Sequence, residues 1–496
     1  MKINVLYGED VKRNFSSEYK YILNVLKPSE LKQWDGCYDY DIDSYTTNSG
    51  QLSEIVPENI LSFDIHDRIM HSFGRSSPEL LSMKHKKLAI VDAVIYPNNQ
   101  NIIKVIENLR KYDYKVIIYG GGTSVNGSLS IGESKKVISL DTRNFKQFEI
   151  YNDYAIAGAG ITGPELENEL NKYGYTIGNF PESFKYSTLG GWIATKATGQ
   201  ESNMYGGIEN IVISSKMITS SGVYQDKIVP RESSGLQIKS IAIGSEGNYG
   251  LITEAAIKLF RKPGKRVFRS YFFKSFDVGL NALKSLKEFP AVARLSDELE
   301  TDIAINGSKN STAKKILEKY LKLRGVNKGS LLILVDNEGK TPLKNINGIR
   351  TGSIPSKNWI DERYSRPGIA NILWKNGLVT DTLETSTDWG NLSKLYHNVI
   401  SEFNRVKDTL NISGIIMGHV SHLYKSGACI YFTFILSLQN EESELKTVRD
   451  TIIRTFLKNG GAITDHHGIG TLFRDYMDKN ILEMQSKLYD KLFSWW

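Results

Sequence analysis

Apolar positions follow two alternating periods in the first half of the chain. Short apolar runs at residues 88–91 and 93–96 predict strands, and apolar residues at i, i+3, i+4 and i+7 across residues 102–109 predict a helix. A further apolar run at residues 116–118 predicts the next strand. A strand, a helix and a strand in this order are typical of an α+β domain that holds its ligand at a strand end.

A glycine-rich loop follows this last strand directly. Residues 119–127 are Tyr-Gly-Gly-Gly-Thr-Ser-Val-Asn-Gly. Successive glycines can adopt positive φ and present their N–H groups to a close anion, while Thr123 and Ser124 add hydroxyl donors. The loop lacks both the helix-opening GxGxxG of a Rossmann unit and the Gly-Lys-Ser/Thr ending of a nucleotide P-loop. It therefore predicts a pyrophosphate cradle that differs from the usual NAD and ATP sites.

Two more glycine-rich segments follow within the same half of the chain. Residues 187–199 combine a glycine pair with small residues and hydroxyls, and residues 244–250 contain three further glycines. The first of these segments allows a flat ring to lie against the main chain, although a tight helix crossing would also favour small residues. Three such loops between residues 119 and 250 exceed what turns alone require. Together they indicate one extended cofactor that the backbone contacts along its length.

The pattern breaks at residues 261–266, Arg-Lys-Pro-Gly-Lys-Arg, which predicts a domain boundary. Beyond it, strand-like runs at residues 267–273 and 331–335 and a helical segment at residues 278–286 predict a second α+β unit.

The chemistry of the second half lies near its end. Strand alternation over residues 427–434 places Ile430, Phe432 and Phe434 on one face and leaves the hydroxyl of Tyr431 on the other, directed into a pocket. Further along, Asp465-His466-His467 lie in a glycine-flanked turn. Because imidazoles exchange protons near neutral pH, this pair is a candidate for acid–base catalysis.

Composition narrows the function classes. The 496 residues are 40% hydrophobic and 24% charged, which suits two globular units with a large core. The formal net charge of +7 contains no dense Lys/Arg block, so nucleic acid is a poor candidate partner, whereas an anionic substrate or a membrane surface stays open. Only Cys37 and Cys429 are present, which argues against a disulfide framework. With no apolar run of roughly 20 residues and no signal-peptide core, we expect a soluble, cytoplasmic protein.

Five separate segments resemble one known family. Residues 119–127, 184–199, 244–254, 419–434 and 460–470 are similar to alkyl-dihydroxyacetonephosphate synthases, which belong to the vanillyl-alcohol-oxidase-type FAD-binding (PCMH-type) flavoproteins. The resemblance implies an α+β fold with a two-subdomain FAD-binding part and an α+β cap. It also implies that the chain has four parts. They are an N-terminal segment 1–84, an FAD-binding domain 85–265, a cap or substrate domain 266–440 and a segment 441–496 that returns to the FAD domain.

The same resemblance implies that the cofactor is FAD. The residues expected to bind its pyrophosphate are Gly120, Gly121, Gly122, Thr123, Ser124, Asn126 and Gly127. Those expected near the flavin ring are Ser187, Thr188, Gly190, Gly191, Thr195 and Ile252, with Glu246 also at the cofactor. Because no histidine stands in the phosphate loop to form a covalent link, we expect the FAD to be non-covalent.

In the resembled family, the flavin N5 forms an adduct with acyl-dihydroxyacetone phosphate, the fatty acid leaves, and a fatty alcohol replaces it without net redox change. Carried over by motif, Tyr431 and His467 would be proton donor and acceptor, His466 would assist, and Arg294 would hold an anionic group. A further cap arginine is expected, with Arg363 and Arg366 as candidates. The substrate would be a small, anionic molecule; whether it is a lipid stays open, as do peripheral membrane contact and a homodimer.

Two other functions remain open. An FAD-dependent D-2-hydroxy-acid dehydrogenase or oxidase shares the fold, but its metal site needs a histidine where this chain has Ser426. His419, His422 and Asp465 could still bind zinc, although their spacing is a weak indication and we expect no metal. The third hypothesis is a non-catalytic flavin-binding scaffold.

Overall fold

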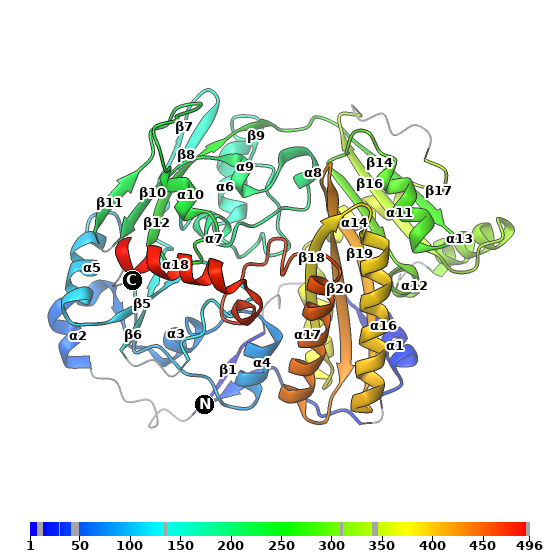
Figure 1. Ribbon diagram of the computed structural model, residues 1–496, viewed down its shortest axis with the longest axis horizontal. Coiled ribbons are helices and arrows are strands. Elements are labelled where there is room, and N and C mark those ends of the chain that lie inside the picture. The colour runs from blue at the N-terminus through cyan, green and yellow to red at the C-terminus, as the bar shows by residue number, and fades with distance from the viewer. Residues whose placement is uncertain are drawn as a thin grey trace.

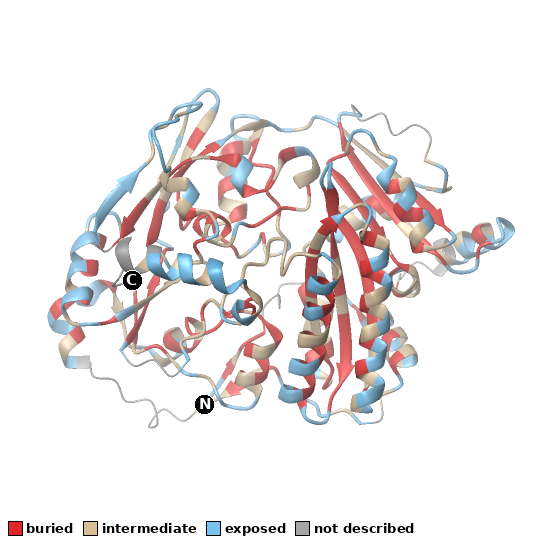
Figure 2. Ribbon diagram, in the orientation of Figure 1, coloured by how far each residue is buried: buried red, intermediate tan, exposed pale blue. Residues whose placement is uncertain are grey.

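The chain forms two lobes that lie side by side (Figure 1). The computed structural model describes residues 1–6, 13–28, 30–40, 49–132, 136–219, 221–307, 311–339 and 346–492. Most strands of both lobes are buried, whereas the outward faces of the helices are exposed (Figure 2). Each lobe is therefore a sheet structure with its own core.

The first lobe contains a four-stranded and a five-stranded sheet. The four-stranded sheet has the order β3-β4-β6-β5, in which β4, β6 and β5 are parallel and β3 is antiparallel. Helix α5 connects β4 to β5, and its apolar residues at the predicted spacing are all buried, as expected. These elements are β3 (Leu61–Ser62), β4 (Ala93–Ile95), α5 (Ile102–Lys111), β5 (Lys115–Tyr119) and β6 (Val137–Asp141). The glycine-rich loop thus lies at the carboxyl end of a parallel strand.

The five-stranded sheet is antiparallel, with the order β11-β10-β12-β8-β7. Its strands are β7 (Phe148–Ile150), β8 (Tyr154–Gly158), β10 (Val212–Thr219), β11 (Gly222–Gln225) and β12 (Leu251–Lys258), and β9 (Tyr175–Thr176) pairs separately with β13 (Phe260–Arg261). The other helices of the lobe are α2 (Ser49–Ile55), α3 (Ile65–Met70), α6 (Gly163–Asn171), α7 (Leu189–Thr195), α8 (Ser202–Tyr205), α9 (Ile208–Ile211) and α10 (Ile238–Ala242). Helix α4 (Ser77–Lys84) packs against the cap instead, on α17 and β18. At the start of helix α6, the backbone N–H and the hydroxyl of Thr162 both donate to the carboxylate of Glu165.

The second lobe, the cap, is built on a seven-stranded antiparallel sheet of order β17-β14-β16-β15-β19-β20-β18. Its strands are β14 (Arg266–Phe273), β15 (Val292–Ser296), β16 (Ser330–Asn337), β17 (Ile349–Gly352), β18 (Val379–Asp388), β19 (Ser413–Leu423) and β20 (Gly427–Ser437). Its helices are α11 (Phe276–Lys284), α12 (Glu298–Asn306), α13 (Ser311–Leu323), α14 (Ile354–Glu362), α15 (Arg366–Lys375), α16 (Leu392–Leu410) and α17 (Glu441–Lys458).

Strand alternation in the cap separates a packed face from an open one. Ile430, Phe432 and Phe434 are fully buried in the core under α16 and α17, which confirms the predicted alternation of β20. The opposite face, which carries Tyr431, lines a cavity. The cap sheet therefore uses one face for stability and the other for ligands.

The division of the chain differs from the expectation at both ends. The first lobe begins before residue 85, because β3 pairs with β4. Helix α1 (Ser16–Leu26), in contrast, packs against α12, α15 and β19 of the cap. Helix α17 also packs in the cap, against α16 and β18, so the chain returns to the first lobe only after residue 458. The short pair β1 (Lys2–Asn4) and β2 (Cys37–Asp39) precedes the main sheets, and α18 (Lys479–Leu492) lies over the first lobe (Figure 1).

No helix within the described residues combines the length and the apolar character that a bilayer crossing requires.

Candidate active site

One cavity of about 1740 Å³ joins the glycine-rich loops of the first lobe to the open face of the cap sheet. Sites for drug-sized ligands occupy roughly 300–1,000 Å³. The cavity therefore has room for a dinucleotide together with a second molecule.

Most residues expected at the cofactor line this cavity. They are Gly120, Gly121, Gly122, Thr123, Ser124, Ser187, Thr188, Gly190, Gly191, Thr195, Glu246 and Ile252. Asn126 and Gly127, which were expected at the pyrophosphate, are not on its wall. The Asn126 side chain is fully buried and donates to the Glu246 carboxylate, while Gly127 packs against Thr471. These two residues fasten the loop to the C-terminal segment instead of facing a ligand.

The phosphate loop fits a pyrophosphate. A Cβ on Gly121 would lie 2.1 Å from the carbonyl oxygen of Tyr186, so only glycine allows this close approach of two backbones. Gly122 has φ +62°, the left-handed region that glycine adopts at no cost. The Ser124 hydroxyl is buried and has no hydrogen-bond partner among the described residues. A phosphate oxygen would satisfy this orphan donor, and FAD therefore fits the residues present.

Glu246 connects three parts of the cofactor site. It has φ +50°, and its carboxylate accepts hydrogen bonds from Asn126 and from the backbone N–H of Gly470, the latter at 2.9 Å. Burial raises the pKa of this carboxyl despite the hydrogen bonds it accepts. Glu246 thus couples the phosphate loop to the segment that carries the two histidines.

Replacing Glu246 with alanine is expected to weaken FAD binding about 10- to 100-fold, because the buried donors of Asn126 and Gly470 lose their acceptor. The measurement is fluorescence titration of the apoprotein with FAD. The matched control, Glu246→Gln, keeps a carbonyl acceptor and should lose much less. An unchanged dissociation constant in the alanine variant would show that the loop does not depend on this contact.

The Tyr431 hydroxyl lies between two imidazoles. It is 2.8 Å from Nε2 of His466 and 2.8 Å from Nε2 of His422. The ring of His419 stacks on Tyr431, with centroids 4.6 Å apart and planes 13° from parallel. Burial raises the pKa of the Tyr431 phenol well above its ordinary value. The phenol is therefore neutral at physiological pH, and these hydrogen bonds give its proton a route to the imidazoles, while its cavity side is open to a ligand.

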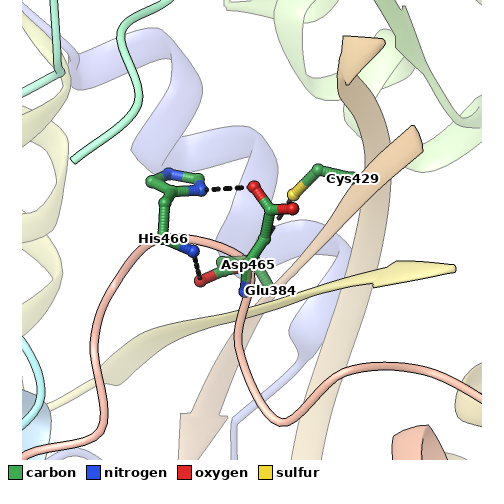
Figure 3. Close-up of side chains that lie close together, drawn as sticks. All are labelled: Glu384, Cys429, Asp465 and His466. Atoms are coloured by element: carbon green, nitrogen blue, oxygen red, sulfur yellow. Dashed lines mark hydrogen bonds and ion pairs between the residues drawn. The ribbon is translucent and has the colours of Figure 1, made fainter. Parts of the chain in front are cut away.

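A buried carboxylate holds the histidine turn in place. Glu384 on β18 accepts from the backbone N–H groups of Asp465, His466 and His467 at 2.6, 3.2 and 3.0 Å, and from the hydroxyl of Thr464. Figure 3 shows Glu384 beside Asp465 and His466. Although burial alone would raise it, His466, His467 and these donors hold the pKa of Glu384 at about 2. The turn is thus wrapped around a permanent negative charge.

His466 and His467 differ in how readily they are protonated. Nδ1 of His466 lies 3.0 Å from the Asp465 carboxylate, which also accepts from the Tyr424 hydroxyl at 2.8 Å. Burial disfavours the charged imidazole, but the Glu384 and Asp465 carboxylates outweigh it and raise the pKa of His466. For His467, burial and the neighbouring His466 lower the pKa to about 4. His466 is therefore the imidazole most readily protonated at neutral pH.

The partner of Tyr431 differs from the expectation. His466, which was expected only to assist, makes the hydrogen bond, whereas the His467 ring is 6.0 Å from that of Tyr431, centroid to centroid. Nδ1 of His467 faces Glu384 at 3.5 Å instead, and the side chain lines the cavity. Adjacent residues of a tight turn cannot both reach the same hydroxyl, which accounts for the difference.

Arg294 lines the cavity but already has an anionic partner. It is buried and donates to Glu300 at 2.5 Å, and Glu300 also lies 3.3 Å from Nδ1 of His419. Of the two candidates for the further cap arginine, Arg363 is held by the buried Glu201 at 2.8 Å. Arg366 has a side chain that is 43% exposed and contacts Glu300 only at 3.4 Å, so it retains the most capacity to bind an anion in the cavity.

The zinc ligands of the alternative hypothesis do not gather in the described part of the chain. His419 faces Glu300, and His422 bonds Ser202 and Tyr431. Ligand atoms of a different set, Glu384, Cys429, Asp465 and His466, lie close enough for one ion (Figure 3). Both oxygens of Glu384 already accept backbone or hydroxyl donors, so this cluster is explained as the support of the turn.

Comparison with known proteins agrees with this geometry. Residues 91–226 match the FAD binding domain, and residues 262–492 match the C-terminal domain of FAD linked oxidases. An alkyldihydroxyacetonephosphate synthase of Trypanosoma brucei brucei is 29% identical over 85% of this chain and 74% of its own length. The enzyme of that name from Dictyostelium discoideum is 29% identical over 81% and 71%. A solved alkyldihydroxyacetonephosphate synthase structure matches the fold with a TM-score of 0.83 at 24% identity, over 97% of this chain and 91% of the other.

The fold and the cavity lining define an FAD-binding flavoenzyme with a cap domain. The predicted α+β fold and the predicted cofactor are confirmed by these matches. The chain contains the FAD binding domain and the C-terminal domain of FAD linked oxidases, and over most of its length it resembles alkyldihydroxyacetonephosphate synthases.

Proposed function

We propose that this enzyme exchanges the acyl group of acyl-dihydroxyacetone phosphate for a fatty alcohol, without net oxidation or reduction. The observation that carries the proposal is the continuity of one cavity from the FAD loops, past Tyr431, to an apolar arm in the cap. It is supported by the synthases to which the chain is similar over most of its length.

The apolar arm has the character needed for a hydrocarbon chain. Its walls come from α1, α12, α13 and α15 and from the open face of the cap sheet. They include Phe15, Ile22, Ile303, Ile305, Leu317, Ile369, Leu373, Met417 and Ile435. Burial of a hydrocarbon against such walls contributes about 0.8 kcal/mol per methylene, which favours long-chain substrates over short ones.

The polar part of the cavity suits a phosphate ester. Of Arg294, Arg363 and Arg366, Arg366 retains the most capacity for an anion, because Glu300 compensates Arg294 and Glu201 holds Arg363. We therefore assign the anionic group of the substrate to Arg366 and give Arg294 the role of orienting Glu300 and its neighbours.

Proton transfer falls to the phenol and its charged neighbour. Tyr431 is placed to take the proton of the incoming alcohol, and His466, held by Asp465, stabilises the negative charge that develops on the phenol oxygen. Bound FAD supplies the reactive isoalloxazine ring. Gly190, Gly191 and Ile252 line the part of the cavity that would hold this ring, and the phosphate loop contains no histidine to form a covalent link to it.

The test uses the purified holoenzyme under anaerobic conditions. Acyl-dihydroxyacetone phosphate and a labelled fatty alcohol are supplied with no electron acceptor, and the expected result is a labelled ether lipid with release of fatty acid. Absence of label, together with bleaching of the flavin by a D-2-hydroxy acid, would replace the proposal with the dehydrogenase. Acid precipitation of the same sample should leave the flavin in the supernatant if it is non-covalent.

The mouth of the apolar arm supports a proposal of peripheral membrane contact. Ile316 on α13 and Ile354 on α14 line the cavity, yet they are 65% and 63% exposed. Leu323, two turns after Ile316 on α13, is 78% exposed. Lys315 and Lys319 are also exposed on this helix. Apolar side chains flanked by lysines are typical of helices that lie on anionic bilayers. A lipid substrate would then pass from the bilayer into the arm.

Replacing Ile316 and Leu323 with aspartate is expected to weaken binding to anionic phospholipid vesicles at least about 10-fold, because two apolar anchors become charged. Co-sedimentation with the vesicles measures this. The control is Ile481→Asp on α18, an exposed isoleucine of the other lobe, which should bind as the parent does. Equal sedimentation of all three proteins would remove the membrane proposal.

Location in the cytoplasm also remains a proposal. Both Cys37 and Cys429 are free thiols, which supports a reducing compartment.

A further inference from the structure

His422 occupies an irregular position of the cap sheet. Strands β19 and β20 pair residue for residue as far as Ser421 opposite Cys429, and pairing resumes at Leu423 opposite Ala428. His422 is the extra residue of this β-bulge and has φ +49°, a left-handed conformation that histidine, asparagine and glycine tolerate better than most residues. Without the bulge, His422 would share the face of Val420, which is fully buried in the core.

The first lobe holds the bulge in position. The backbone N–H of Leu423 donates to the side-chain oxygen of Asn203 at 2.6 Å, and Nδ1 of His422 lies 2.8 Å from the Ser202 hydroxyl. Both partners are on α8, at the junction between the lobes. Because bulges and left-handed residues recur where a side chain must be re-aimed at a functional site, this arrangement indicates a role for the imidazole itself.

The hydrogen bonds around Tyr431 have one consistent direction. His466 favours its charged form beside Asp465 and Glu384, so its Nε2–H donates to the phenol oxygen. The phenol then has one proton to give, and among the described residues Nε2 of His422 is the acceptor in place for it. Burial and the neighbouring His466 keep the pKa of His422 well below its ordinary value, so this ring is neutral and carries its proton on Nδ1, toward Ser202.

We infer that His422 is a positioning residue that accepts the proton of Tyr431 while Tyr431 takes the proton of the incoming alcohol, with Ser202 fixing its tautomer. The inference rests on the proposed exchange. Over that exchange, the ester C–O bond breaks, the acid leaves as a carboxylate with the electron pair, and the alcohol oxygen forms the new C–O bond. The alcohol loses one proton in this step. His422 accepts that proton first, and the proton is then released to water. The charged or titratable groups that face His422 are Tyr431, His419, His466, His467 and Asp465.

The decisive variant is His422→Gly, which suits the left-handed backbone and leaves room for a free imidazole. We expect the rate at saturating substrate to fall about 100-fold or more, with the Michaelis constant and FAD affinity unchanged, and added imidazole to restore part of the rate. His422→Asn also suits the backbone and should be equally slow, but imidazole should not restore it. A rate within about 3-fold of the parent in either variant, or failure of imidazole to rescue a correctly folded glycine variant, would overturn the inference.

A second measurement needs neither substrate nor turnover. Nitrogen NMR of histidine-labelled protein, with His422→Asn identifying the resonances, should show a neutral ring protonated on Nδ1. Ser202→Ala should shift that signal. It should also slow the acyl-for-alkyl reaction, by a smaller factor than the His422 variants do. A ring protonated on Nε2, or one indifferent to Ser202, would contradict the relay. If the parent enzyme makes no ether lipid while this signal is as expected, the proposed function fails and the hydrogen-bond arrangement stands.

Discussion

Tyr431→Phe is expected to lower the rate of acyl-for-alkyl exchange about 1,000-fold while FAD stays bound. The change removes one oxygen atom that joins two imidazoles at 2.8 Å each. The ring remains to stack on His419, so the shape of the cavity is preserved. The loss should therefore appear in the rate at saturating substrate and not in the Michaelis constant. Steady-state kinetics with a labelled alcohol, together with the flavin spectrum, measure both.

A matched control exists for the loss of a tyrosine hydroxyl. Tyr396 on α16 is buried and donates to Asp297 at 3.1 Å, but it does not line the cavity. Tyr396→Phe should cost about 1 kcal/mol of stability and leave the exchange rate near that of the parent. If Tyr431→Phe retained more than about a tenth of the activity, the phenol would not transfer the proton in the rate-limiting step.

Local patterns predicted the elements that depend on a single periodicity. The apolar spacing of α5 and the alternation of β20 follow from burial of one face, and both are as expected. The phosphate loop was visible for a related reason, because only glycine allows Gly121 to approach the carbonyl of Tyr186. In these cases a local geometric requirement determines the residue type, so the residue type reveals the structure.

His422 shows where that approach fails. Strand alternation along β19 predicts that His422 lies on the core face with Val420, and the neighbouring residues do not predict a bulge. The contact that holds the bulge comes from Asn203, more than two hundred positions earlier in the chain. The functional placement of His422 is therefore a tertiary property.

Glu384 and Glu300 were missed for a similar reason. Glu384 lies on a largely polar strand, Val-Thr-Asp-Thr-Leu-Glu-Thr-Ser-Thr-Asp, where an acidic side chain would ordinarily face water. It is 2% exposed because the turn at residues 464–467 folds over it, about 80 residues further along the chain. Glu300 likewise shares no local motif with Arg294, and their ion pair is what redirects the expected anion site toward Arg366.

Glu384→Ala is expected to have the second large effect, on stability and on rate together. Three backbone N–H groups and the Thr464 hydroxyl lose their acceptor in a buried place. Leaving such donors unpaired costs about 1–3 kcal/mol each, so a loss of at least 3 kcal/mol is expected. The turn should loosen, His466 should leave Tyr431, and the exchange rate should fall at least about 100-fold. Urea unfolding and steady-state kinetics measure the two effects.

The control separates this effect from the general cost of removing a buried carboxylate. Glu444 on α17 is buried and accepts from the backbone N–H groups of Gln439 and Asn440 at 2.8 and 3.0 Å, but it is outside the cavity. Glu444→Ala should lower stability and leave the rate unchanged. A normal rate in Glu384→Ala would mean that the turn keeps its shape without the carboxylate.

The pH dependence of stability gives an independent test of the same charge. The folded protein holds the pKa of Glu384 at about 2, below the ordinary value near 4.3, because it binds the ionised form more tightly than the unfolded chain does. Its contribution, roughly 3 kcal/mol at 1.36 kcal/mol per pKa unit, is complete above about pH 4.5 and disappears as the pH falls toward 2. The stability difference between the parent and Glu384→Gln should therefore be largest at neutral pH and shrink on acidification through this window. A difference that stayed constant from pH 7 to pH 2.5 would show that Glu384 holds the turn as a neutral acceptor and not as a charge.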